Sequence, residues 1–246
     1  MDTKVIIIII IIILLVIYFI VNKLIDYNIP MYCIYIPKRE IDIKRLFNSY
    51  DMNVTFIKGI DKENIDVDEL IKTNQITKWN DVNKGRIACH YSHLNVLKEF
   101  LQTSEKRCII FEDDLSIDEN LKLILKYKLN KIIKNTSIGV DLLYLGYCYQ
   151  NCQNEIIVNK YMNKTNGALC RHAYMINRKA AKIILNETIH MYNNGDQMYK
   201  NLINNKQINS CVVNSNNILF RQNRLKYGSE LNNNPNSPPI CRETIY

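Results

Sequence analysis

The sequence predicts an α/β domain with a mostly parallel central sheet, and two observations support this prediction. Short apolar segments typical of buried strands alternate along the chain with segments whose apolar residues recur at helical spacing. Strands that alternate with helices favour a parallel sheet covered by helices. One predicted strand ends in three consecutive carboxylates, Glu112, Asp113 and Asp114, and ligands of such sheets bind at the carboxyl ends of the strands.

The N-terminal residues 1–28 are predicted to form a membrane anchor. The segment from Val5 to Val21 has 17 residues without a charge and consists almost entirely of isoleucine, leucine and valine, which reaches the lower limit of a membrane-spanning helix. A cleaved signal peptide is the alternative, but no small-residue cleavage site follows the segment. The flanking charges nearly cancel, so they leave the orientation open.

Residues 29–231 are enough for one domain with its own core, and the polar residues 232–246 are predicted to be a flexible tail. The formal net charge of +8 suits an anionic ligand, although a general excess of lysine explains it equally well. No arginine-rich run or stripe of interleaved aromatic residues occurs, which argues against nucleic-acid binding.

Seven segments have the composition of strands. Each is a short apolar run that contains β-branched or aromatic residues and is bounded by glycine, proline or polar residues. They are residues 31–37, 52–61, 107–111, 141–146, 167–176, 210–213 and 218–220.

Other segments have apolar residues at helical spacing. In the longest of them, Ile87, Leu94 and Leu101 share one face. Ser116 and Asn177 are predicted to be N-caps. The predicted helices are residues 39–50, 86–104, 116–133, 178–185 and 195–205, whereas residues 66–75 form a short helix or a loop.

The three consecutive carboxylates repel one another and are costly to remove from water. They could form a solvated turn, or they could open a helix, because a helix dipole favours acids in the first turn. Alternatively, they bind a hard cation such as Mg²⁺ or Mn²⁺, which in proteins usually also holds substrate phosphates. Their position at the end of a strand favours the cation. P-loop and dinucleotide folds are disfavoured because their glycine-rich signatures are missing.

Eight cysteines are too few for a disulfide scaffold in a chain of 246 residues. Cys33, Cys89 and Cys108 stand in apolar segments and are predicted to be buried thiols. Cys148 and Cys152 could close a small disulfide loop or remain free thiols. No second pair has the spacing of zinc ligands, which argues against a structural zinc site.

Two segments in close succession, "GRIACHYSHLNVLKEF" and "IIFEDDL", resemble glycosyltransferase family 25, the group of lipooligosaccharide and procollagen galactosyltransferases. The first has Cys89, Ser92 and His93 where the family has a Gly-Cys-x-x-Ser-His helix, with Ala88 in place of the glycine. The second ends in the three acids where the family has Glu-Asp-Asp. Further similar segments follow the family's order, so that the resemblance covers about residues 32–231.

This resemblance implies a GT-A fold and the inverting transfer of a hexose, galactose or glucose, from a UDP-sugar to a hydroxyl acceptor. The acceptor is expected to be a glycan, a lipid-linked glycan or a protein. The resemblance also implies dependence on Mn²⁺ or Mg²⁺, because a cation neutralises the charge that builds on the departing diphosphate.

The resemblance also assigns roles to individual acids. It implies that Glu112 and Asp114 bind the cation, with Asp113 as a second ligand or a contact to the ribose. Inversion requires a base that takes the proton of the acceptor hydroxyl, and Asp196 is the candidate. A helix cap is an equally good interpretation of Asp196, because it stands at the start of a predicted helix.

Four residues are predicted to bind the nucleotide sugar. Ser92 and His93 are expected near the donor, although His93 could instead be a hydrogen-bonded structural histidine. Arg39 could contact the nucleotide or its phosphates, or it could be a solvated charge at a helix start. Asp61 could hold the uracil or the ribose, or it could be a turn residue.

Two other functions fit the same residues. A catalytically decayed, membrane-anchored binding or structural protein would keep the fold. A metal-dependent phosphoester hydrolase would use the same acids, but such enzymes usually have more acid and histidine ligands, and the four histidines do not form such a set. For a chain from a eukaryote or its virus, we expect a single-pass type II membrane protein with its catalytic domain in the lumen of the endoplasmic reticulum or Golgi.

Overall fold

The computed structural model describes residues 3–24, 29–148, 150 and 156–227. Within these residues the centre of the fold is one eight-stranded sheet with the order β2-β1-β3-β8-β5-β9-β7-β6, and β10 pairs with β4 in a second sheet. The large sheet consists of β1 (Met31–Tyr35), β2 (Thr55–Lys58), β3 (Arg107–Glu112), β5 (Leu142–Gly146), β6 (Ile156–Asn159), β7 (Met162–Lys164), β8 (Ala173–Asn177) and β9 (Ser210–Val213). The second sheet consists of β4 (Leu115–Ile117) and β10 (Phe220–Gln222).

Most strands of the large sheet point in one direction. β1 runs parallel to β2 and to β3, and β5 runs parallel to β9. β8 is antiparallel to both of its neighbours, β3 and β5, and β7 is antiparallel to β9 and β6. The prediction of a mostly parallel α/β sheet is therefore confirmed, with β8 and β7 as the strands that run the other way.

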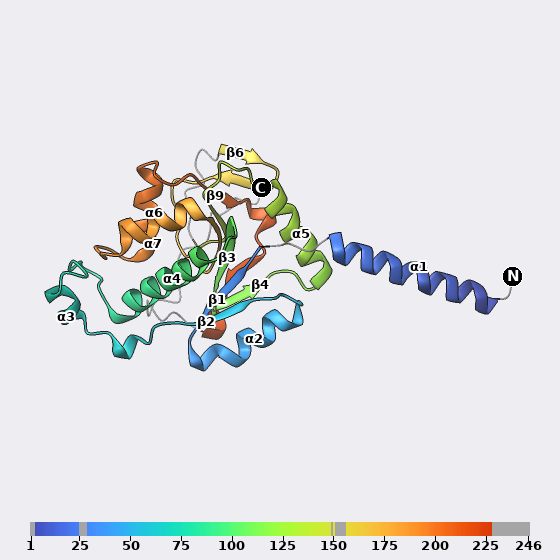
Figure 1. Ribbon diagram of the computed structural model, residues 1–246, viewed down its shortest axis with the longest axis horizontal. Coiled ribbons are helices and arrows are strands. Elements are labelled where there is room, and N and C mark those ends of the chain that lie inside the picture. Colours follow the sequence, from blue (N-terminus) through green and yellow to red (C-terminus); the bar gives the residue numbers. More distant parts are fainter. Residues whose placement is uncertain (1–2, 25–28, 149, 151–155, 228–246) are drawn as a thin grey trace.

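Helices cover the sheet on both faces. Figure 1 shows α4, α6 and α7 together on one side of the sheet and α5 on the other. The helices are α1 (Thr3–Leu24), α2 (Glu40–Ser49), α3 (Val67–Lys72), α4 (Lys84–Gln102), α5 (Lys122–Asn135), α6 (Arg178–Thr188), α7 (Gly195–Asn204) and α8 (Arg224–Tyr227), with 3-10 turns at Pro37–Arg39, Lys62–Asn64 and Ser215–Asn217. Residues 66–75, predicted as a short helix or a loop, contain the short helix α3.

The prediction of a helix over residues 116–133 is wrong at its start. Ser116 is not a helix cap but lies in β4, and α5 begins at Lys122. β4 pairs antiparallel with β10, so that Leu115 lies opposite Gln222. This pairing joins segments about a hundred residues apart, and a local periodicity cannot detect it. The hairpin of β6 and β7 was not predicted either, and the strand predicted over residues 167–176 is confined to β8.

The N-terminal apolar run forms α1. Of the helices built from described residues, none combines the length and the apolar character that crossing a membrane requires. The predicted anchor over residues 1–28 therefore has no support from the structure. The tail predicted for residues 232–246 lies outside the described residues.

The acid-bearing strand β3 is held in the core by aromatic packing. The ring of Phe111 lies 5.1 Å from that of Phe47 on α2 and 5.0 Å from that of Phe220 on β10, measured between centroids. Cys33 on β1 and Cys108 on β3 are fully buried thiols, as predicted. The burial of β3 up to its last residues fixes the position of the carboxylates that follow.

The contact between α6 and α4 orients the helix that carries the Ser-His motif. Asn177 caps α6 as predicted, since its side chain accepts a hydrogen bond of 2.8 Å from the backbone N–H of Ala180. The next residue, Arg178, donates to the carbonyls of Leu101 (2.8 Å) and Thr103 (2.6 Å) at the end of α4. These carbonyls would otherwise lack partners at the helix end.

Gly146 at the end of β5 has no room for a side chain. A Cβ atom there would overlap with the carbonyl oxygen of Phe220 and the imidazole of His172. We expect Gly146→Ala to lower the free energy of unfolding by about 1–3 kcal/mol, the usual cost of overpacking. Gly139→Ala is the control, because its Cβ atom would meet its nearest neighbour, Asn209 Nδ2, at 3.9 Å. Chemical denaturation of both variants tests this, and equal midpoints would contradict it.

Candidate active site

A cavity of about 410 Å³ lies where β1, β2 and β3 end against α4. The ends of parallel strands gather the side chains that follow them at one edge of the sheet. Seven of the eight residues predicted from the sequence line this cavity: Arg39, Asp61, Ser92, His93, Glu112, Asp113 and Asp114. Asp196 does not line it. The cavity therefore brings the predicted donor and cation residues together, while their roles stay predictions.

Asp113 forms a buried ion pair with Arg39. Its Oδ1 accepts from Arg39 Nη1 at 2.8 Å, and its Oδ2 accepts from the backbone N–H of Ile36 at 2.6 Å. The guanidinium of Arg39 also lies over the ring of Tyr227, 4.9 Å from its centroid. Arg39 is 6% exposed, so its interpretation as a solvated charge is wrong. The pair connects the segment after β1 to the end of β3.

Asp114 is a buried carboxylate with one oxygen lacking a hydrogen-bond partner. Its Oδ2 accepts from Gln222 Nε2 at 2.6 Å, whereas its Oδ1 has no hydrogen-bond partner among the described residues. Burial, and then the charge of Glu112, raise the pKa of Asp114 to about 7. Asp114 is 7% exposed and is followed by β4. The solvated-turn and helix-opening interpretations of the acids are therefore wrong.

Glu112 is held from the side of α4. Its Oε1 lies 2.8 Å from His93 Nε2, and His93 Nδ1 lies 2.9 Å from the hydroxyl of Tyr174. Burial holds the pKa of His93 well below its usual value, so the imidazole is neutral. A neutral imidazole donates from one nitrogen only. We assign the donor to Nε2, which faces the carboxylate, and the acceptor to Nδ1, which faces Tyr174.

This arrangement makes His93 an orienting partner of Glu112. Burial raises the pKa of Glu112, whereas the charge of Arg171 lowers it. The sulfur of Cys89, one turn before His93 on α4, lies 3.6 Å from Glu112 Oε1. The interpretation of His93 as a hydrogen-bonded histidine is therefore confirmed, and its imidazole still lines the cavity.

Ser92 and Asp61 shape the wall on the side of β2. The hydroxyl of Ser92 donates to the carbonyl of Ala88 at 2.6 Å and accepts from the N–H of Ile60 at 2.8 Å. Ser92 therefore fastens the loop after β2 to α4. Asp61 accepts from the N–H of Glu63 at 3.0 Å, which confirms its interpretation as a turn residue. Its carboxylate remains at the exposed rim of the cavity.

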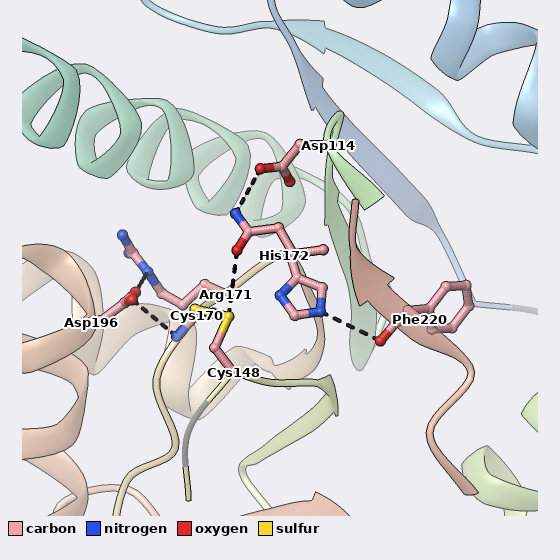
Figure 2. The surroundings of a disulfide bond; sticks show 8 residues. Asp114, Cys148, Cys170, Arg171, His172, Asp196 and Phe220 are labelled. Carbon is pink, nitrogen blue, oxygen red and sulfur yellow. Dashed lines mark hydrogen bonds and ion pairs between the residues drawn. A yellow bond between two sulfur atoms is a disulfide. The ribbon is translucent and has the colours of Figure 1, made fainter. Parts of the chain in front are cut away.

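Asp196 stands in the first turn of α7, but it is not the cap. Asn194 caps the helix by accepting from the N–H of Gln197 at 2.9 Å. Asp196 instead accepts from Arg171 Nε at 2.7 Å and from the N–H of Cys170 at 2.9 Å, as Figure 2 shows. Both carboxylate oxygens are therefore engaged, one of them with an arginine whose side chain is 3% exposed.

Sequence reasoning missed two residues of this region. Gln222 lies on β10 and lines the cavity, and no local signal in the sequence points to it. Arg171 precedes β8 in the apolar segment "GALCRHAYMI", and a charge in such a segment does indicate a buried partner. Arg171 also lies over the ring of Tyr199, 4.6 Å from its centroid.

The structure contains a disulfide that the sequence did not predict. Cys148 pairs with Cys170, whose Cα lies 5.5 Å away. The small loop proposed between Cys148 and Cys152 is therefore wrong, and Cys152 lies outside the described residues. Cys89 is a free, partly buried cysteine.

The acids at the end of β3 fit a hard divalent cation. Asp114 offers a buried oxygen that has no hydrogen-bond partner in the described part of the chain, and the neighbouring charge of Glu112 is one cause of its raised pKa. A bound cation would compensate both charges and supply the partner that this oxygen lacks. Asp113 fits this role less well, because both of its oxygens already accept hydrogen bonds.

Comparison with known proteins agrees with the resemblance seen in the sequence. Residues 36–199 match the model of a family described as glycosyltransferase family 25 (LPS biosynthesis protein). A curated relative, the probable inactive glycosyltransferase 25 family member 3 of Rattus norvegicus, is 29% identical over 77 residues, which are 31% of this chain and 13% of that protein. The inactive glycosyltransferase 25 family member 3 of Mus musculus is 27% identical over the same shares. The matched part thus spans about an eighth of these relatives.

Two solved structures show a distant likeness. A glycosyltransferase involved in the glycosylation of the major capsid of PBCV-1 has a TM-score of 0.43 and 9% identity, covering 78% of this chain and 93% of that one. A UDP-glucose pyrophosphorylase complexed with UDP-glucose has a TM-score of 0.37 and 6% identity, covering 75% of this chain and 90% of that one.

The neighbouring acids Asp113 and Asp114 are expected to affect stability in opposite ways. Asp113→Ala removes one partner of a buried ion pair and should cost about 3 kcal/mol of unfolding free energy. Asp114→Asn removes a buried charge and keeps an oxygen for Gln222, so at pH 8 it should leave stability unchanged or raise it. Urea denaturation at pH 8 compares the two, and a larger loss for Asp114→Asn would refute this assignment.

Proposed function

Because this chain belongs to glycosyltransferase family 25, we propose that it transfers a hexose, galactose or glucose, from a UDP-sugar to a hydroxyl acceptor with the help of Mn²⁺ or Mg²⁺. The acceptor would be a glycan, a lipid-linked glycan or a protein. One observation carries the proposal. A single cavity collects the acids Glu112 and Asp114 together with the residues of the Ser-His helix.

Glu112 and Asp114 would hold the cation. When bound there, the cation neutralises the charge that develops on the diphosphate leaving group. The protein orients each carboxylate from a different element: His93 on α4 contacts Glu112, and Gln222 on β10 contacts Asp114. Such fixed partners keep the ligand oxygens in place without the donor.

The rest of the cavity suits the nucleotide part of a donor. Its volume of about 410 Å³ lies within the range of small-molecule sites, about 300–1,000 Å³. Arg39, held by Asp113, would stabilise the phosphates, and Asp61 at the rim would bind the ribose or the uracil. Lys38 and Lys62 also line the cavity and add positive charge.

Asp196 remains the candidate base for an inverting transfer. It does not line the cavity, but its charge acts on Glu112, and Arg171 fixes its orientation. To accept a proton, Asp196 must exchange or share one of its present hydrogen bonds with the acceptor hydroxyl. Hydrogen bonds of this kind often tighten only once the substrates are bound.

A non-catalytic binding protein of the same fold is the second candidate, because the curated relatives bear names that call them inactive. The retained acids and their partners favour the transferase. For the hydrolase alternative, two of the four histidines lie away from the acids and add no ligand to them. His90 contacts the carbonyl of Thr188, and His190 contacts that of Asn74.

Hydrolysis of nucleotide sugars separates the two candidates. We expect the wild-type chain, in the presence of Mn²⁺, to release UDP slowly from one of several UDP-sugars tested. This release should stop when a chelator is added. Asp114→Asn should lower the rate at least about 100-fold, as loss of a main electrostatic stabiliser does. No release from any donor, with no stabilisation of the fold by UDP and Mn²⁺, would instead support the binding protein.

Cation affinity should depend on pH through Asp114. The proton and the cation compete for this carboxylate, so affinity rises as the proton leaves. With a pKa of about 7, the carboxylate is about one-tenth ionised at pH 6 and about nine-tenths at pH 8, which predicts an approximately tenfold gain in Mn²⁺ affinity. Calorimetric titration with Mn²⁺ in the presence of UDP, at pH 6 and at pH 8, measures this gain in affinity. Asp114→Asn should bind weakly with a flatter pH profile, and a flat profile in the wild type would disprove the role of Asp114.

A further inference from the structure

The Cys148–Cys170 disulfide is connected through short contacts to two of the acids that the proposed function uses, Asp114 and Asp196. Cys148 follows β5 and Cys170 precedes β8, and these strands are neighbours in the sheet. On its other side, β8 pairs with β3, so that Ala173 lies opposite Phe111 just before the acids. Figure 2 shows the bond below Asp114 and next to Asp196.

One arm of contacts leads from the disulfide to Asp114. Cys148 Sγ lies 3.4 Å from Gln222 Oε1, and the amide of the same glutamine donates from Nε2 to Asp114 Oδ2 at 2.6 Å. A disulfide sulfur carries no hydrogen, so Cys148 supports Gln222 by packing against it. With its oxygen side against the sulfur, Gln222 presents its NH₂ group to Asp114.

The other arm leads to Asp196. The backbone N–H of Cys170 donates to Asp196 Oδ2 at 2.9 Å, and the adjacent Arg171 donates from Nε to Oδ1 at 2.7 Å. Cys170 has a φ of +69°, a left-handed conformation that residues other than glycine rarely adopt. Such a conformation persists only when the surroundings hold it, and the bond to Cys148 is one such restraint. It keeps the N–H of Cys170 directed at Asp196.

We propose that the Cys148–Cys170 disulfide is a positioning element of the transfer site, which holds Gln222 against Asp114 and the N–H of Cys170 against Asp196. Its role in catalysis rests on the proposed function. Its effect on Asp114 can be measured separately, as a change in Mn²⁺ affinity. Neither cysteine lines the cavity, so the disulfide acts through these residues. Loss of the bond should therefore weaken cation binding and lower turnover in a protein that remains folded.

The test compares Mn²⁺ affinity in the presence of UDP between the oxidised wild type and the Cys148→Ser/Cys170→Ser variant. We expect about tenfold weaker binding in the variant, because partners that orient metal ligands typically contribute 10- to 100-fold. Dithiothreitol should have the same effect on the wild type, since it converts the disulfide to two thiols and is itself oxidised to a cyclic disulfide. The variant should not respond to it, which excludes an effect through the other cysteines.

Two further variants separate positioning from stability. Leu129→Ala empties a buried site on α5 and should lower the denaturation midpoint as disulfide loss does, yet leave Mn²⁺ affinity unchanged. Gln222→Met keeps the disulfide and the bulk of the side chain but removes the hydrogen bond to Asp114. It should reproduce the loss of Mn²⁺ affinity, and it tests this arm even if the double variant fails to fold.

The outcomes distinguish this inference from the proposed function. Suppose that the wild type binds Mn²⁺ and releases UDP, and that the disulfide-free and Gln222→Met variants have the same Mn²⁺ affinity and the same rate of UDP release. The positioning role of the disulfide is then overturned, whereas the proposed transferase function stands. If the wild type shows neither activity, both proposals fall. If Leu129→Ala loses affinity as strongly as the disulfide-free variant, the effect is one of stability, which also overturns the positioning role.

Discussion

The placement of three consecutive carboxylates at the end of β3, where Asp113 and Asp114 are buried and Glu112 is half-buried, is the constraint on which the site depends. Each acid finds a different compensation. Asp113 pairs with Arg39 from the segment after β1, Glu112 contacts His93 on α4, and Asp114 contacts Gln222 on β10. An uncompensated buried charge is costly. The segment after β1, α4 and β10 therefore all contact the end of β3. The cavity is the space that remains between them.

The negative charge of Asp113 is fully compensated, whereas that of Asp114 is not. This difference separates the roles of the two acids. Asp113 has both oxygens engaged and joins two parts of the backbone. Asp114 has a buried oxygen that accepts no hydrogen bond from the residues the structure describes, and its pKa is raised. The protein's own groups therefore do not fully balance the negative charge of the Asp114 carboxylate. The imbalance is what a cation and an anionic donor together can remove.

The sequence predicted the parts of the fold that local pattern encodes. The alternation of strands and helices, the cap at Asn177 and the gathering of acids with the Ser-His helix all follow from short segments. The pairing of β4 with β10 and the contact between Gln222 and Asp114, 108 residues apart, depend on the folded chain. The same holds for the partner of Cys148 and for the acid that the buried Arg171 contacts. Local spacing also could not tell that Asp113 faces an arginine.

The bonds that hold α4 determine how the cavity can change shape. Arg178 fixes the carboxyl end of this helix, and the contact of His93 with Glu112 holds its middle. Ser92, next to His93 on the helix, is hydrogen-bonded to Ile60 in the loop after β2. A tilt of α4 would carry this loop with it. Two walls of the cavity are thus mechanically one body, which is anchored to α6 at one end and to β3 beside the cavity.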